Sequence, residues 1–243
     1  MRYNRFKPDL LKWHKTNRNR SATSAPHWHG LNRNRWHNNS DFTGTIQTEI
    51  ANNSIQVDSL NVPLDKNQGY FPLKIFTDTS IYVGYDTFHV EWYSKHLTAM
   101  KEPLIFNKKQ DKSTFRFLWL RTFHNPISIR IEKQFDSYSL TWKLCDGAGG
   151  YEPGKLVIDK TKIIDKNTWD TFQDKLSKAD YWNLKTNEVG ILGTDGSQWI
   201  LEGTDKNNYH VVDRWTPSGG SFYECCDFLI RLTDFKIMGD DKY

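Results

Sequence analysis

The chain has 243 residues, of which 26% are charged and 37% are hydrophobic, and its formal net charge is +4. A chain of this length can bury a full hydrophobic core without disulfides or metal ions. Its three cysteines, two of them adjacent, predict reduced thiols. No apolar run is long enough to predict a transmembrane helix, and the N-terminus lacks the apolar region of a signal peptide. These features indicate a soluble globular protein, cytoplasmic by default.

The positive charge is concentrated at the N-terminus. Residues 1–40 contain nine Lys or Arg against one Asp, a charge of +8, so residues 41–243 contain 24 against 28, a charge of −4. The octapeptide WHKTNRNR at 13–20 recurs as WHGLNRNR at 28–35. A segment this basic and this poor in aliphatic residues predicts a disordered arm over 1–42, followed by a single domain over 43–243.

The strongest helical pattern begins after Asp86, a suitable N-cap. Large side chains then recur every four residues, which predicts an amphipathic helix that ends before Pro103. The predicted buried stripe consists of Phe88, Trp92, His96 and Met100, with Tyr93 and Leu97 beside it. Residues 41–85 show a weaker pattern, which predicts an irregular lead-in with one or two edge strands.

Two further helices are predicted nearer the C-terminus. Asn167 is a suitable N-cap for a helix over 168–179. Ser221 and Glu224 have the spacing of a capping box, which predicts that the last helix begins there.

Alternating hydrophobic and polar residues predict strands over 115–121, 127–133, 138–144 and 155–164, and a hairpin over 195–217. Such alternation is typical of a sheet with one buried and one solvated face. Because the strands come in runs between the helices, the order favours an α+β fold in which a twisted antiparallel sheet packs against about three helices.

The hairpin over 195–217 contains most of the predicted binding site. If the pairing joins residues of like parity, Trp199 and Asp213 lie on a core face. The opposite face then presents Glu202, His210 and Arg214, and in one register Glu202 lies directly opposite His210. A carboxylate beside histidine raises the proton affinity of the imidazole and fixes its tautomer, as a ligand site or a general base requires. The alternative interpretation is a cross-strand ladder of salt bridges without a functional role.

Arg121 and His124, where the strand over 115–121 ends, complete the candidate ligand-binding set if that strand lies beside the hairpin. The sequence does not assign catalytic residues.

The segment DGAGGYEPGK at 146–155 has the glycine and lysine spacing of a phosphate-binding loop. A P-loop needs a Ser or Thr after the lysine and then a helix, whereas Leu156 follows here and the sequence continues as a strand. The segment therefore predicts a tight glycine-rich connection. No CxxC pair, GxSxG elbow or HExxH motif occurs, so we predict neither a cofactor nor a metal site.

Several blocks of the sequence together resemble a family of uncharacterised bacterial proteins, some of which have lipoprotein-type leaders. These blocks are WYSKHLTAMKEPLIF (92–106), FRFLWLRTFHNPISIRIE (115–132), DGAGGYEPGKL (146–156), DGSQWILEG (195–203) and YHVVDRWTP (209–217). The resemblance implies no known activity, cofactor or catalytic residue. It does imply exported relatives, which leaves the compartment open.

Three functions are compatible with these features. The leading hypothesis is a non-catalytic binding module that presents the polar sheet face to a small polar ligand or a protein partner. The second is a hydrolase-like enzyme in which His210 or His124 is the general base, oriented by Glu202 or Asp213. The third is a weak nucleic-acid contact through residues 1–40, with arginines on phosphates and tryptophans stacked on bases.

Overall fold

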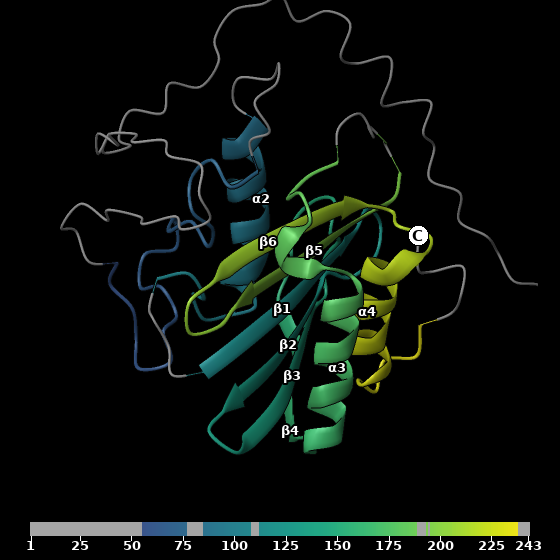
Figure 1. Cartoon of the computed structure of the whole chain (residues 1–243). Helices are drawn as coiled ribbons and strands as arrows, with labels where there is room; N and C mark the ends of the chain where they lie inside the picture. Colours follow the sequence, from purple (N-terminus) through teal and green to yellow (C-terminus); the bar gives the residue numbers. More distant parts are fainter. Residues whose placement is uncertain (1–54, 77–84, 108–111, 189–192, 194, 238–243) are drawn as a thin grey trace, which may run out of the picture. The chain divides into compact units, whose positions relative to one another are not determined.

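The computed structural model describes residues 55–76, 85–107, 112–188, 193 and 195–237 (Figure 1). The described residues all belong to one compact unit, Asn53–Tyr243. The predicted arm over 1–42 and the predicted domain start at residue 43 lie outside the described residues.

The described residues contain one antiparallel sheet of six strands in the order β4-β3-β2-β1-β5-β6. The strands are β1 (Lys112–Arg121), β2 (Ile127–Gln134), β3 (Ser137–Cys145), β4 (Leu156–Ile163), β5 (Ser197–Thr204) and β6 (Tyr209–Trp215). The predicted strands and the α+β class are confirmed. In the lead-in, the described residues contribute one isolated bridge, between Val57 and Pro63.

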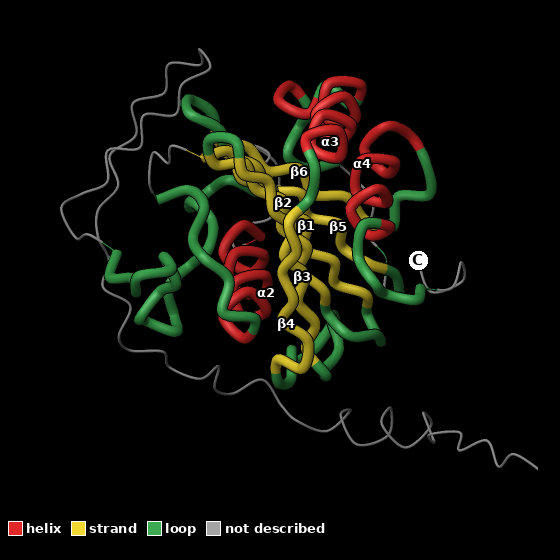
Figure 2. The backbone as a smooth tube through the Cα atoms, turned by 90° about the horizontal axis from the view of Figure 1, so that it is seen from below, coloured by secondary structure: helices red, strands yellow, loops and turns green. Residues whose placement is uncertain are grey.

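Within the described residues, three α-helices pack on this sheet, as predicted: α2 (Tyr85–Ala99), α3 (Lys166–Lys178) and α4 (Gly220–Arg231). A short 3-10 helix, η1 (Tyr181–Asn183), follows α3. Figure 2 shows the sheet nearly edge-on, with α2 on one side and α3 and α4 on the other. We call these two sides the α2 face and the α3–α4 face.

The central strands β1 and β5 are buried on both faces, so the prediction of one solvated face is wrong there, whereas the edge strand β4 is largely exposed. On the α3–α4 face, Phe117, Trp119 and Trp199 join the hydrophobic core beneath the two helices. On the α2 face, Leu118 and Ile200 join a second core that includes residues of α2. The polar residues that alternate with the apolar ones in the strands are therefore largely covered by a second layer of chain rather than by water.

The predicted buried stripe of α2 is confirmed toward its C-terminal end, where His96 is fully buried, but not toward its N-terminal end. Tyr93, Leu97 and Met100 are fully buried, whereas the Phe88 side chain is 58% exposed and Trp92 is half-buried. Residues four apart on an α-helix drift by about 40° per step, so Phe88 and Met100 point about 120° apart and cannot share one stripe. This rotation leaves Phe88 and Trp92 at the edge of the core.

Two helix starts also differ from prediction. The N-cap of α3 is Asp165, whose Oδ1 accepts a hydrogen bond from the Thr168 backbone N–H at 2.7 Å, and Asn167 lies inside the helix. The helix α4 begins at Gly220 without a side-chain cap, so the predicted capping box at Ser221 does not form. Asp165 forms the α3 cap because its carboxylate lies three residues before a free N–H.

Candidate functional site

The register of the β5–β6 hairpin separates the predicted site residues. Glu202 pairs with Val211, and His210 pairs with Gly203. Because directly paired residues point to the same face, Glu202 lies on the α2 face and His210 lies on the α3–α4 face with Arg214. The prediction that Glu202 faces His210 is wrong, because the hairpin joins residues of unlike parity.

His210 and Arg214 both hold the segment that follows η1 against β6. The Nε2 atom of His210 lies 2.9 Å from the Leu184 carbonyl oxygen. The Arg214 guanidinium donates to the carbonyl oxygens of Lys185 and Thr186, each at 2.9 Å. Burial lowers the pKa of both side chains. Arg214 also forms an ion pair with Glu188 at 2.9 Å, and His210 packs against the Tyr181 ring, so both side chains are engaged within the protein.

Arg121 and His124 lie where β1 ends. The Arg121 guanidinium packs over the Trp119 ring at 4.4 Å from its centroid and donates to the Asn125 carbonyl oxygen at 3.4 Å. The backbone N–H of His124 donates to the Arg121 carbonyl, and the His124 carbonyl accepts from the Gly149 N–H at 2.9 Å. The structure therefore spreads the five predicted residues over two sheet faces and a turn.

Glu202 belongs to a buried ion network on the α2 face. Its carboxylate pairs with Arg116 of β1 and accepts a hydrogen bond from the Tyr209 hydroxyl at 2.8 Å. Arg116 also donates to the Pro103 carbonyl oxygen at 2.7 Å. Burial raises the pKa of Glu202, and Arg116 and Tyr209 offset part of that rise.

Glu102 is the second anion of this network and comes from the segment after α2. Its carboxylate lies 3.0 Å from Arg130 Nε and 3.4 Å from Lys143 Nζ. Burial acts to raise the pKa of Glu102, but Arg130, Lys143 and Arg116 outweigh it and hold the pKa below its usual value. The network therefore satisfies its own charges and anchors the segment after α2 to the sheet.

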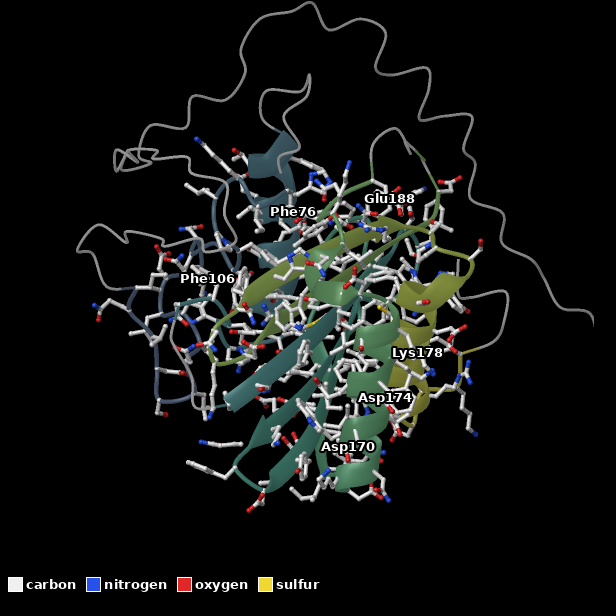
Figure 3. All side chains as sticks on the ribbon, viewed as in Figure 1. Phe76, Phe106, Asp170, Asp174, Lys178 and Glu188 are labelled. Atoms are coloured by element: carbon white, nitrogen blue, oxygen red, sulfur yellow. The ribbon has the colours of Figure 1, made fainter. Side chains whose placement is uncertain are left out.

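A cavity of about 650 Å³ lies between α2 and the end of the sheet where β5 and β6 pair. Its walls contain the aromatic side chains of Phe88, His89, Trp92, Tyr151 and Trp215 beside polar and charged residues that include Lys95. The exposed side chains of Glu91 and Glu188 also line it, and Glu188 is labelled in Figure 3. The rotation of α2 that takes Phe88 and Trp92 away from the core places them in this wall.

Asp213 and Gln198 line the same cavity, although their side chains are only 6% and 7% exposed. The Tyr93 hydroxyl donates to Asp213 Oδ2 at 2.8 Å. The Gln198 amide nitrogen donates to the Tyr93 hydroxyl at 2.9 Å. Asp213 Oδ1 and Gln198 Oε1 are buried and have no hydrogen-bond partner among the described residues.

Asp213 is chemically the most perturbed carboxyl group of the cavity. Burial raises its pKa to about 7, although the hydrogen bond from Tyr93 and the charge of Arg214 act to lower it. The group therefore changes protonation near neutral pH. A buried carboxyl with a shifted pKa in a concave site is typical of binding and catalytic sites.

Sequence reasoning placed Asp213 on a structural face because it assumed the wrong hairpin register. A signal for the correct register was present. Asp205 accepts hydrogen bonds from the backbone N–H groups of Asn207 and Asn208, each at 2.8 Å, and so forms a four-residue turn. A turn with an even number of residues pairs strand positions of unlike parity, which places Asp213 and Gln198 on one face with Glu202.

The blocks that carry the family resemblance meet at this cavity. Each of the five contributes a lining residue, namely Trp92, Thr122, Tyr151, Gln198 and Asp213. Comparison of the chain with protein-family models and with curated proteins gives no match. The resemblance therefore stays a prediction.

The described segments hold no group of three or more His, Cys, Asp or Glu side chains placed to bind a metal ion. Nor do those segments include a helix that is long and apolar enough to cross a membrane. Cys145, Cys225 and Cys226 are free and buried, as predicted for reduced thiols. Burial raises the pKa of Cys226, which argues against a reactive thiolate there.

Proposed function

We propose that the protein binds a small polar ligand in the cavity between α2 and the β5–β6 hairpin. A volume of about 650 Å³ is in the range of small-molecule sites, about 300–1,000 Å³. Aromatic walls with a few polar groups are also typical of such sites. This proposal keeps the predicted class, a binding module, and moves its site from the outward sheet face to the cavity.

The observation that carries the proposal is that Asp213 and Gln198, which both line this cavity, each keep a buried acceptor oxygen without a partner among the described residues. Leaving a buried polar atom without a hydrogen bond costs about 1–3 kcal/mol. Such a cost persists in a protein when the group serves a purpose other than stability. A bound ligand that donates hydrogen bonds would remove this cost.

The observed contacts do not favour a hydrolase that uses His210. Glu202 and Asp213, the two carboxylates that would orient it, lie on the opposite face of the sheet. The His210 Nε2 atom is also engaged with the Leu184 carbonyl. No such general base is therefore included in the proposal.

A panel of neutral, cationic and anionic fragments, screened against the full chain by ligand-observed NMR, tests the proposal. Trp92→Ala removes part of the cavity wall and should abolish the signals of the fragments that bind there. Trp182→Ala is the matched control, since Trp182 is also half-buried but packs on the α3–α4 face. The proposal is wrong if no fragment binds, or if both variants retain the same fragments equally well.

A further inference from the structure

We infer that the ligand is a protonated amine with a flat apolar body, whose ammonium group is held by the Asp213 carboxylate and whose body lies between the aromatic walls. This inference rests on the proposed function and adds to it the chemical class of the ligand.

Three residues that line the cavity each keep a buried polar atom without a hydrogen-bond partner among the described residues, and all three atoms are acceptors. Asp213 accepts from Tyr93, so the Gln198 amide must turn its nitrogen toward them and its oxygen away. Asn187, which also lines the cavity, donates its amide nitrogen to the Phe76 carbonyl and leaves its Oδ1 buried without a partner among the described residues. Three unpartnered acceptors on lining residues favour a ligand that is rich in hydrogen-bond donors, and an ammonium group has three N–H donors.

The charged groups around the cavity leave the Asp213 carboxylate without a cationic hydrogen-bond partner. The hydrogen-bond partners of the Asp213 carboxylate, Tyr93 and Gln198, are both neutral. The cations near the cavity already have anionic partners: Lys95 pairs with Glu152 and Arg214 pairs with Glu188, each at 2.9 Å. The exposed Glu91 adds a further negative charge to the lining. The cavity therefore favours a cation over an anion.

The aromatic side chains of the cavity wall also favour a cation with a flat apolar body. Trp92, Trp215, Phe88 and Tyr151 present aromatic rings around the cavity. Aromatic faces attract a cation by about 0.5–2 kcal/mol, and they also pack well against a flat apolar group. A neutral sugar or alcohol would use the walls but would leave the charge of Asp213 without a counterion.

Binding of an ammonium group should also release protons. The Asp213 pKa of about 7 means that the group is partly protonated at neutral pH, and a bound cation favours its ionised form. Tyr93 of α2 contacts Asp213 directly, and the charge of Arg214 acts on it from the opposite face of the sheet. The other titratable or charged groups that line the cavity are His89, Glu91 and Lys95 of α2 and Glu188. The affinity for the amine should therefore rise between pH 6 and pH 8.

Three probes of nearly equal shape separate the charge states: 2-phenylethylamine, 2-phenylethanol and phenylacetate. We expect the full-length protein at pH 8 to bind the amine at least about tenfold more tightly than the alcohol, and the anion most weakly, as measured by NMR titration. Equal or tighter binding of the alcohol or of phenylacetate would overturn the inference while leaving the proposed function intact. Binding of none of the three would also overturn it, and the fragment panel would then decide the proposed function separately.

Two variants assign the effect to the cavity. Asp213→Asn should lower the affinity for the amine about tenfold or more and leave the affinity for the alcohol within about twofold. Asp174→Asn, the same change on the exposed side of α3 (Figure 3), should alter neither affinity. Gln198→Leu keeps the Asp213 carboxylate but removes the unpartnered Gln198 oxygen, together with the amide donor to Asp213 Oδ2, and it should weaken amine binding severalfold. Amine binding that is unchanged in both cavity variants would contradict the inference.

Discussion

Burial of Asp213 disfavours its ionised form, whereas the proposed amine site uses that ionised form. The unfolded chain would ionise it with a pKa near 3.9, about the usual value for Asp. In the folded protein burial raises the pKa to about 7, so the folded state keeps a proton that the unfolded state has lost. The contribution of Asp213 to stability must therefore fall as the pH rises between about 4 and 7, because this group binds more protons in the folded state in that range.

This linkage predicts the effect of Asp213→Asn. The difference between a pKa near 3.9 in the unfolded chain and about 7 in the folded protein corresponds to about 4 kcal/mol of folding stability lost above pH 7. Asn at this position avoids the loss because it does not ionise. We expect the variant to match the wild type near pH 4 and to be the more stable protein at pH 8, as measured by urea unfolding. His96, whose pKa burial lowers to about 4, affects both proteins equally and cancels in the difference.

The matched control for this prediction is Asp174→Asn, whose difference from the wild type should not change with pH. A stability difference between Asp213→Asn and the wild type that is the same at pH 4 and pH 8 would contradict the shifted pKa.

Among the structural elements, the central strand β1 depends on a glycine in its neighbour β5. Gly203 pairs with Phe115 of β1 on one side and with His210 of β6 on the other. A Cβ atom added to Gly203 would lie 2.5 Å from the Phe115 ring and 2.9 Å from the Tyr181 hydroxyl. The missing side chain therefore provides the space that the Phe115 ring occupies.

We expect Gly203→Ala to destabilise the protein by about 1–3 kcal/mol, the usual cost of overpacking a core. Gly219→Ala is the control, because a Cβ atom there would meet nothing within 4 Å. Urea unfolding of the two variants tests the prediction. Equal stability of both would mean that Phe115 and Tyr181 can move aside.

Among the described residues of the molecule, the two faces of the sheet carry different kinds of side chain. The α3–α4 face is a hydrophobic core with several aromatic rings, such as Trp119, Trp169 and Trp199. The α2 face carries the ion network around Arg116 and, beside α2, the cavity with Asp213. Ligand binding in the cavity can therefore be changed by mutation without disturbing the larger core.

The basic arm remains a separate prediction at this scale. Residues 1–40 carry a charge of +8 against −4 for the rest of the chain. If the arm contacts nucleic acid, its deletion should abolish binding to a labelled single-stranded oligonucleotide, and binding by the intact chain should weaken steeply between about 50 and 200 mM salt. Fluorescence anisotropy measures both. Binding that survives the deletion, or no binding by the intact chain, would reject this role.

Local patterns in the sequence predicted most of the fold. The alternation in 127–133 and 138–144 identified β2 and β3, and the punctuation around 146–155 identified a connection rather than a nucleotide site. The predictions failed for helix starts and for the buried stripe of α2, which depend on single residues and their exact spacing. The two helix starts were misplaced because several polar residues near each start can cap a helix, and the α2 stripe was misplaced because a four-residue spacing drifts around a 3.6-residue helix.

The sequence by itself determined the α+β class, the strands and the helices, because hydrophobic periodicity is a local property of the chain. Only the tertiary structure decided which residues form the candidate site. A hairpin register that differs by one position moves every side chain of one strand to the other face. Here it places Asp213, in place of the predicted His210 and Arg214, on the α2 face with Glu202. The cavity also needs α2 and the loop after β3, which are distant in sequence and come together only through packing on the sheet.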